Sequence, residues 1–306
     1  MPCPQLVLSN DTVKMRLYLP DANQGYYRGV RFDWSGLIFR AGWGKHRFYE
    51  EFRKGGDPKG HDHVCGPAEE FSMEDPPGYD EAKPGQTFVK IGVGLLEKPE
   101  DPKDPNYGFW KSYKIVNSPP WKVTGGKDRV EFRQDLQGDR GWGYSYLKTI
   151  RLTDGGFVIE HVLKNTGLKP IDTTQYNHNF TVIDGEHIEP DTRVRFAAEA
   201  PTLGVVKAGK PVLKDGCLSV AEKLKGSLWV QLGGLKGTAQ ENDIRIENTK
   251  AGAGVRIKGD LPILKIVVYA EDHSICPEPF VAIKAEPGKE VKWQWEYTFL
   301  ELKGDK

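Results

Sequence analysis

The stretch that decides the fold is residues 144–182, YSYLKTIRLTDGGFVIEHVLKNTGLKPIDTTQYNHNFTV. It contains three runs rich in β-branched and aromatic residues, Tyr144–Leu152, Phe157–Leu163 and Ile171–Val182. The sequences TDGG and NTG punctuate them with turn-forming residues. Short β-type runs joined by Gly, Asp and Asn turns are typical of antiparallel hairpins. This part of the chain therefore predicts consecutive antiparallel strands.

The same rhythm extends over the rest of the chain. Gly occurs 35 times and Pro 21 times among 306 residues, and no segment longer than about 12 residues keeps a helical period. The further strand-like runs are Val30–Phe39, Phe88–Leu95, Val130–Arg133, Arg193–Ala197, Leu228–Leu232, Asp243–Glu247, Gly254–Lys258, Ile263–Tyr269 and Lys292–Leu300. Residues 53–86, rich in Gly, Pro and acids, are interpreted as a long loop. We expect an all-β protein, a large antiparallel β-sandwich with few short helices, in which residues 1–306 form a single domain.

Composition narrows the classes of partner. Lys plus Arg and Asp plus Glu both number 43, so there is no electrostatic reason to expect nucleic acid or an anionic membrane surface. No apolar run approaches the roughly 20 residues of a membrane-spanning helix. The four cysteines form no CxxC pair or Cys/His metal spacing, so we expect no metal and no cofactor. A monomer or a homodimer is expected.

The N-terminus carries no secretion signal that the sequence reveals. Met1-Pro2-Cys3-Pro4 shows no basic segment followed by an apolar core, which is the pattern of a signal peptide. The sequence therefore leaves the cellular location undecided. The protein is cytoplasmic or, if a signal peptide has been removed, periplasmic or secreted.

Two segments stand out as candidates for chemistry, Gln175–Phe180 (QYNHNF) and Ile275–Phe280 (ICPEPF). Period-2 alternation places His178 on the same strand face as Tyr176, a composition suited to stacking on a sugar. Glu278 lies between two prolines in an apolar stretch, which favours a half-buried carboxylate with a raised pKa. On the residues alone, a buried structural histidine and a surface glutamate in a Pro-rich loop are the favoured interpretations.

Further motifs surround these candidates in a fixed order. The apolar run Ile263–Tyr269 precedes Cys276–Phe280, the turn Pro287–Glu290 follows, and Trp293–Phe299 alternates aromatic residues. This order resembles the C-terminal end of the aldose 1-epimerase (galactose mutarotase) superfamily. Asn177–Phe180 is similar to that family's Asn-His-x-Tyr-Phe segment. The resemblance covers roughly residues 140–300 well and the N-terminal part loosely.

The resemblance implies a fold and a reaction. The fold would be the galactose mutarotase-like supersandwich, and the activity would be interconversion of the α and β anomers of an aldose. Glu278 would be the general base on the anomeric hydroxyl, and His178 the general acid on the ring oxygen. With ordinary pKa values, Glu278 would be ionised and His178 partly protonated at neutral pH. We expect their side chains roughly 5–8 Å apart, leaving room for a sugar.

The resemblance also implies substrate-binding residues, but this chain departs from the pattern. The family supplies a second histidine and an arginine from its N-terminal third, whereas the matching region, Gly66–Phe71, lacks the His-Gly pair. A small sugar is the expected partner, and its identity is left open. The candidates to contact it are Arg40, His61, His63, Glu70, Lys90, Tyr176 and Asp243.

Two other functions remain open at this point. A non-catalytic carbohydrate-binding protein of the same fold would need only aromatic side chains, which Trp43, Trp110, Trp142 and Tyr176 could supply. A polysaccharide-processing domain, associated with a lyase or hydrolase, would be expected to add a Tyr or Arg base in the same cleft. Fold alone does not discriminate between these possibilities.

Overall fold

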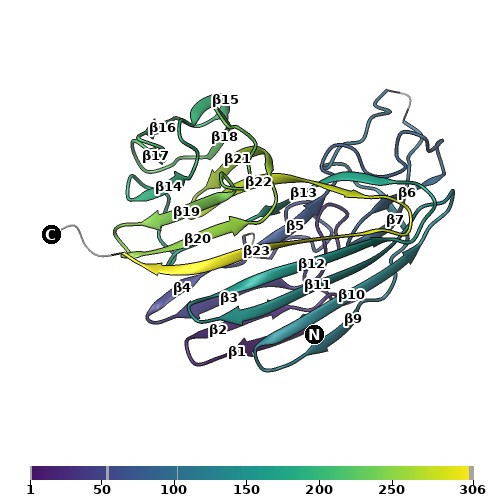
Figure 1. Ribbon diagram of the computed structural model, residues 1–306, viewed down its shortest axis with the longest axis horizontal. Helices are drawn as coiled ribbons and strands as arrows, with labels where there is room; N and C mark the ends of the chain where they lie inside the picture. Colours follow the sequence, from purple (N-terminus) through teal and green to yellow (C-terminus); the bar gives the residue numbers. More distant parts are fainter. Residues whose placement is uncertain (1, 53–54, 102, 303–306) are drawn as a thin grey trace.

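The computed structural model describes residues 2–52, 55–101 and 103–302. These residues form strands β1 to β23 and no helix, and every strand pair is antiparallel (Figure 1). The predicted all-β antiparallel sandwich is confirmed, while the few short helices expected beside it do not occur in the described ranges. Within them, accordingly, no helix is present that could cross a membrane.

The largest sheet has ten strands in the order β16-β17-β14-β19-β20-β23-β12-β11-β10-β9. Their bounds are β9 (Lys122–Gly125), β10 (Arg129–Gln137), β11 (Gly143–Thr153), β12 (Gly156–Asn165), β14 (Thr192–Phe196), β16 (Pro211–Lys214), β17 (Cys217–Val220), β19 (Asp243–Asn248), β20 (Ala253–Gly259) and β23 (Glu290–Glu301). The hairpin expected at the turn TDGG is present, since β11 pairs with β12. The hairpin expected at NTG is wrong, because the chain crosses there from β12 to the six-stranded sheet, where β13 pairs with β22 and β5.

Three smaller sheets complete the fold. The six-stranded sheet, ordered β15-β18-β21-β22-β13-β5, holds the candidate catalytic residues. Its strands are β5 (Ala68–Phe71), β13 (Ile171–His178), β15 (Thr202–Ala208), β18 (Ser227–Gly233), β21 (Ile263–Glu271) and β22 (Ser274–Ala285). The four-stranded sheet contains β1 (Gln5–Ser9), β2 (Val13–Tyr18), β3 (Leu37–Trp43) and β4 (His46–Phe48). The three-stranded sheet contains β6 (Thr87–Lys90), β7 (Gly94–Glu97) and β8 (Lys114–Asn117).

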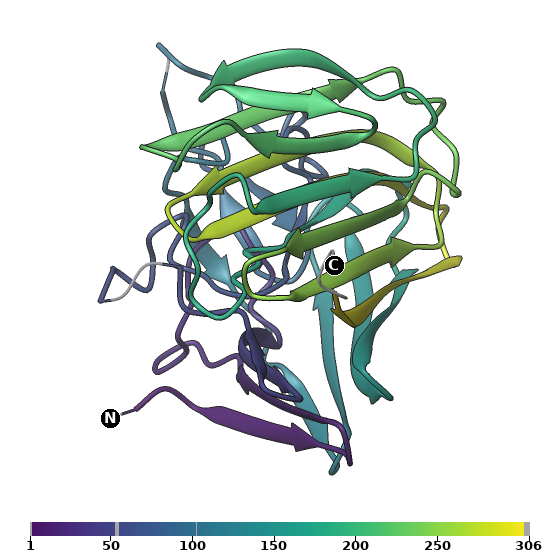
Figure 2. The ribbon, with the colours of Figure 1, turned by 90° about the vertical axis from the view of Figure 1, so that its left-hand side faces the viewer.

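One apolar core joins the three larger sheets. Met15 of the four-stranded sheet, Ile159 and Trp295 of the ten-stranded sheet, and Val268 and Ile283 of the six-stranded sheet belong to the same buried cluster. Figure 2 shows the N-terminal strands (purple) at the bottom of the molecule and strands of the second half (green) at the top. Strands with one face on this core, such as β10 and β23, are buried on alternate residues. The shared core supports the single-domain prediction, which stays a prediction.

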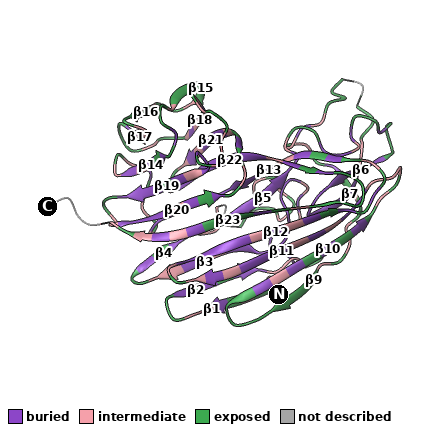
Figure 3. Ribbon diagram, in the orientation of Figure 1, coloured by how far each residue is buried: buried purple, intermediate pink, exposed green. Residues whose placement is uncertain are grey.

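Exposure concentrates at the edges of the sheets. All residues of β9 and nearly all of β15 are exposed, and both are edge strands (Figure 3). Inner strands such as β22 are buried along almost their whole length. A strand that is buried on both faces has a nearly continuous apolar sequence. A polar side chain buried in β22 therefore needs a hydrogen-bond partner.

Two runs that we read as continuous strands are interrupted. Within residues 30–39, β3 begins only at Leu37, because the Asp33 carboxylate accepts hydrogen bonds from Ser35 N at 2.8 Å and Ser35 Oγ at 2.9 Å. Within residues 88–95, β6 and β7 are separated at Gly92, whose φ of 80° is left-handed. The first interruption matters for function, since it leaves Arg31 on a loop.

The loop predicted for residues 53–86 contains a strand. β5 spans only Ala68–Phe71, but all four residues are buried, and it pairs with β13 with Glu70 opposite Tyr176 and Glu69 opposite Asn177. The sequence did not predict this strand, because two of its four residues are glutamates and charged residues are rarely buried without partners.

Candidate functional site

A contact between His178 and Glu278 forms the centre of the candidate site. His178 ends β13, Glu278 lies within β22, and His178 Nε2 is 3.1 Å from Glu278 Oε1. His178 is 6% exposed and Glu278 is 5% exposed. The expected separation of roughly 5–8 Å was therefore wrong. Buried polar groups pair with each other where they can, and here that tendency closes the gap.

The two prolines of β22 explain how Glu278 comes to face His178. The hydrogen bonds between β13 and β22 are interrupted beside Glu278 and resume only at the bridge between Thr181 and Ile275. Ile275 N donates to Thr181 O, so the nitrogens of Pro277 and Pro279, in phase with it along the strand, also face β13. Proline has no N–H to leave unpaired in such a gap. The prolines thus permit a local opening of the sheet where the pair lies.

The backbone after β13 is strained and fixes the histidine ring. Phe180 has a φ of 37°, an uncommon value for an aromatic residue. Its N–H donates to Cys276 Sγ at 3.2 Å, and its ring stacks on that of His178 with centroids 3.8 Å apart. The Phe32 ring meets His178 edge-on at 5.9 Å. Strain of this kind persists only when the surroundings over-determine it, and it is often found at functional sites.

A small pocket of about 220 Å³ opens at the pair. The residues that line it are Arg31, Phe52, His61, Asp62, Met73, Phe109, His178, Phe180, Trp229, Tyr269 and Glu278. Aromatic side chains dominate the wall, and a few polar groups converge at its base. This composition is typical of sites that bind a small ligand through one apolar face and several hydrogen bonds.

Arg31 supplies the positive charge of the pocket. Its Nε donates to Glu70 Oε2 at 2.7 Å, and its Nη2 donates to the Tyr176 hydroxyl at 2.9 Å. The guanidinium carbon lies 4.5 Å from the centroid of the Phe32 ring and 4.3 Å from that of Phe109. Two partners and two rings leave the planar group little freedom, so Arg31 presents a fixed donor to whatever occupies the pocket.

Glu70 and Lys90 lie behind Arg31 and do not line the pocket. Lys90 Nζ is 3.4 Å from Glu70 Oε1, and it donates to Ser72 O at 3.0 Å and to the Tyr107 hydroxyl at 3.1 Å. Burial lowers the pKa of Lys90 to about 8, although the negative charge of Glu70 opposes that shift. One carboxylate therefore faces two cations, Arg31 and Lys90, on this side of β5.

Burial moves the pKa values of the central pair in opposite directions. It raises the pKa of Glu278 to about 8, an increase that the charge of Arg31 opposes. It lowers the pKa of His178 well below its usual value, and Arg31 lowers it further. The pair therefore holds one proton at neutral pH, and these shifts place it on Glu278. The ordinary pKa values assumed from the sequence were wrong because both groups are removed from water.

Some of the predicted substrate-binding residues lie in the pocket or contact its lining, and the others do not. Tyr176, Glu70 and Lys90 join the network that holds Arg31, and His61 lines the pocket itself. His63 is buried nearby but does not line the pocket, since its ring packs 4.5 Å from that of Tyr26.

Two residues that we expected to contact the sugar, Arg40 and Asp243, lie away from this pocket. Arg40 is exposed on β3, opposite Arg16 of β2. Asp243 lies on β19 and forms an ion pair with Arg256, the residue two strand positions from its direct partner. Neither lines the pocket of His178 and Glu278. They lie on β3 and β19, in the four-stranded and the ten-stranded sheets, whereas His178 and Glu278 belong to the six-stranded sheet, and the order of residues along the chain does not reveal this.

The sequence interpretation missed Arg31 and the aromatic residues Phe52, Phe109, Trp229 and Tyr269. Arg31 was assigned to a strand, where it would have alternated with buried apolar residues. That placement was itself a signal, because arginine is almost never fully buried without a partner. The aromatic residues come from separate loops and strands, and no pattern along the chain groups them.

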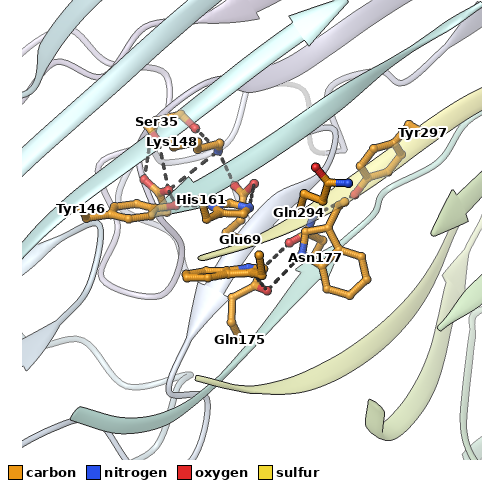
Figure 4. A network of polar contacts seen from close by, with 12 residues as sticks. Ser35, Glu69, Tyr146, Lys148, His161, Gln175, Asn177, Gln294 and Tyr297 are labelled. Atoms are coloured by element: carbon orange, nitrogen blue, oxygen red, sulfur yellow. Dashed lines mark hydrogen bonds and ion pairs between the residues drawn. The ribbon is translucent and has the colours of Figure 1, made fainter. Parts of the chain in front are cut away.

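A second polar network lies on the other face of β5 (Figure 4). Lys148 of β11 forms ion pairs with Glu69 and Asp33 and donates to Ser35 O at 2.7 Å. The Tyr146 hydroxyl contacts Asp33 Oδ2 at 3.2 Å and His161 Nδ1 at 3.0 Å. All these side chains are buried in the core between the sheets. Burial raises the pKa of Glu69 to about 7, against the opposing charge of Lys148.

Neither network has the geometry of a metal site. In the part of the chain that the structure describes, no group of three or more His, Cys, Asp or Glu side chains could hold a metal ion.

Comparison with solved structures identifies the fold of the chain. No family model and no curated protein sequence matches the chain. Solved structures do match. The Slr1438 protein of Synechocystis sp. PCC 6803 has a TM-score of 0.61 at 12% identity, and the match covers 98% of this chain and 97% of that one. A putative aldose 1-epimerase of Escherichia coli K12 has a TM-score of 0.59 at 13% identity, and the match covers 97% of this chain and 100% of that one. The GalM/aldose epimerase homologue of C. elegans has a TM-score of 0.57 at 13% identity and covers 98% of this chain and 99% of that one. The chain has the galactose mutarotase-like fold. At such identity the likeness extends to the fold alone.

Proposed function

We propose that this galactose mutarotase-like protein is an isomerase that interconverts the α and β anomers of an aldose. One observation carries the proposal: His178 and Glu278 lie in contact in one small pocket. The opposite shifts of their pKa values leave the pair with one proton at neutral pH. Ring opening of a hemiacetal needs one group that accepts a proton and another that donates one at the same time. A pair holding one proton meets that requirement.

In the proposed reaction the sugar separates the two groups. Glu278 takes the proton of the anomeric hydroxyl while His178 gives its proton to the ring oxygen. The bond between C1 and the ring oxygen breaks, and C1 becomes the aldehyde carbon. After rotation about the C1–C2 bond, the ring hydroxyl adds to the other face of the carbonyl, and both protons return to their original groups.

The pKa shifts place the single proton of the pair on Glu278 at rest. Its transfer to His178 across the 3.1 Å contact produces the carboxylate and the imidazolium that the reaction uses, and these are a stronger base and a stronger acid than exposed groups. Arg31 lines the pocket with its guanidinium fixed by Glu70 and Tyr176, so it can donate to a sugar oxygen that gains negative charge. The aromatic wall supplies a surface for the apolar face of the ring.

The test is the relaxation of freshly dissolved glucose, galactose and their 6-phosphates, followed by polarimetry. The wild-type protein should accelerate it for at least one sugar. Glu278→Gln keeps the shape of the side chain but removes the base, and His178→Asn removes the acid. Each should lower the rate by about 10²–10⁴-fold. The exposed residues Glu296 and His187 offer matched controls, since Glu296→Gln and His187→Asn should leave the rate unchanged.

A specific observation favours a second candidate, a non-catalytic sugar-binding protein. The 3.1 Å contact between His178 and Glu278 occupies the space that a hemiacetal would enter, while the aromatic wall of the pocket remains available. Methyl glycosides, which cannot open their rings, separate the two functions. Saturable binding of methyl glycosides without acceleration of any free aldose would replace the isomerase proposal by this one.

A further inference from the structure

A second concave surface, independent of the His178 pocket, lies at an open edge of the sandwich. The β1–β2 turn, the β3–β4 hairpin and the end of β23 meet there, on the left of Figure 1. The pocket encloses about 500 Å³. Its lining residues are Asp11, Thr12, Trp43, Gly44, Lys45, His46 and Glu301. No residue of this surface takes part in the proposed reaction.

Strand register directs three of these side chains into the same space. Trp43 and His46 are paired across the β3–β4 hairpin, so their side chains leave the same face of the sheet. The Trp43 ring lies 6.3 Å from that of Phe299 on β23. Glu301 follows Phe299 by two residues in the same strand and so shares its face. The three groups therefore converge between the four-stranded and the ten-stranded sheets.

His46 is the feature that points to a ligand. Its side chain is 5% exposed, and Nδ1 lies 2.7 Å from Asp184 Oδ2. Asp184 is itself fixed, since Arg47 N donates to its other carboxylate oxygen at 2.7 Å. The carboxylate holds the proton on Nδ1, which leaves Nε2 as an acceptor. Nε2 is buried and has no hydrogen-bond partner among the described residues, and buried polar atoms without partners are rare.

The chemistry of the surface selects the ligand class. The His46 Nε2 lone pair and the carboxylates of Asp11 and Glu301 are all acceptors, which call for hydroxyl donors. Trp43 contributes an aromatic face suited to the C–H groups of a sugar ring. The two carboxylates outnumber the one cation of the lining, Lys45, which also disfavours an anion. We propose that this surface is a second, non-catalytic binding site for a neutral saccharide, with His46 accepting a hydroxyl proton and Trp43 stacking on the ring.

Two tryptophans allow the two sites to be observed separately. Trp229 lines the His178 pocket, and Trp43 lines the second site. Methyl glucoside and methyl galactoside should be titrated into the ¹⁵N-labelled protein, with both indole N–H signals followed by NMR. The Trp43 signal should shift saturably at millimolar sugar, and it should do so equally in Glu278→Gln. Because methyl glycosides undergo no ring opening, this result is independent of whether the protein is an isomerase.

Substitutions at the second site sharpen the test. His46→Leu and Glu301→Gln should each raise the dissociation constant reported by Trp43, by about tenfold for His46→Leu, without changing the titration of Trp229. Glu296→Gln, an exposed glutamate on the same strand, should change neither. His46→Gln keeps a polar group and serves if His46→Leu fails to fold. An unchanged Trp43 signal up to tens of millimolar sugar would overturn the proposal. So would a stronger response to glucuronate than to the neutral glycosides.

Discussion

Glu69 and Glu70 are neighbours in β5, yet they lie in opposite electrostatic settings. Glu70, on the pocket side, is one carboxylate between two cations, Arg31 and Lys90. Glu69, on the core side, shares the single cation Lys148 with a second carboxylate, Asp33. The two cations around Glu70 outnumber it, and one of them, Arg31, lines the pocket, where it suits oxygens that gain negative charge during reaction. The core side retains a proton instead, as the raised pKa of Glu69 indicates.

This comparison predicts that the core network serves stability and the pocket network serves function. Lys148 ties Glu69 of β5 to Ser35 and Asp33 of the segment that carries Arg31. The core network thus supports the frame on which the pocket is built, without contacting the pocket. Substitutions on the two sides should consequently differ in what they change.

The largest expected effect is on stability, from Lys148→Met. Removing the cation leaves two buried carboxyl groups, Asp33 and Glu69, without a positive charge beside them, which should lower the free energy of unfolding by about 3–5 kcal/mol. The loss should be smaller at acid pH, because a group with a raised pKa in the folded state binds its proton there and loses stabilisation as pH rises through that pKa. Urea unfolding at pH 5 and pH 8 measures both.

An exposed lysine provides the control for that experiment. Lys284 pairs with Asp172 at 2.9 Å with both side chains mostly exposed. Lys284→Met should therefore cost less than about 1 kcal/mol at either pH. Equal losses in Lys148→Met and Lys284→Met would contradict the structural role of the core network.

The second prediction concerns the pH dependence of mutarotation. The pair loses its shared proton as pH rises through the raised pKa of Glu278, about 8, so the catalysed rate should fall by about tenfold per pH unit above that value. On the acid side the rate should fall only when His178 gains a proton, well below its usual pKa. A profile of kcat/KM from pH 4 to 9, corrected for the uncatalysed reaction, tests this. An alkaline limb near pH 6.5 would mean that His178 titrates as an exposed histidine.

The smallest expected effect comes from removing one tyrosine hydroxyl from each of the two networks. Tyr176→Phe removes a hydroxyl that contacts Arg31 and Glu70, and Tyr146→Phe removes one that contacts Asp33 and His161. Each should lower the free energy of unfolding by about 1.5–3 kcal/mol, the range for hydrogen bonds to charged groups. Only Tyr176→Phe should also lower activity several-fold, because Arg31 then loses one of the partners that orient it. Similar activity losses in both variants would remove the distinction between the networks.

Residues 144–182 and the ICPEPF segment show how far the sequence could be interpreted. The alternation and turns of the first segment are local, and the strands they predict are present with the hairpin at TDGG. The hairpin expected at NTG is absent because β13 pairs with β22 and β5, which are remote in sequence. The second segment offered a strand with a buried Glu278 or a surface loop, and the structure has the strand. Arg31 and β5 were missed because each is stable only through partners remote in sequence, Glu70 for the arginine and β13 for the strand.

The sequence by itself determined the antiparallel β architecture and singled out His178 and Glu278, since hydrophobic period, turn chemistry and short motifs are properties of neighbouring residues. Only the tertiary structure decided that these two side chains touch, that Arg31 stands beside them, and that Asp243 and Arg40 lie elsewhere. It also decided the protonation of the pair. Burial and charge are set by groups that converge from distant parts of the chain, and the pKa of each group follows from that environment rather than from its residue type.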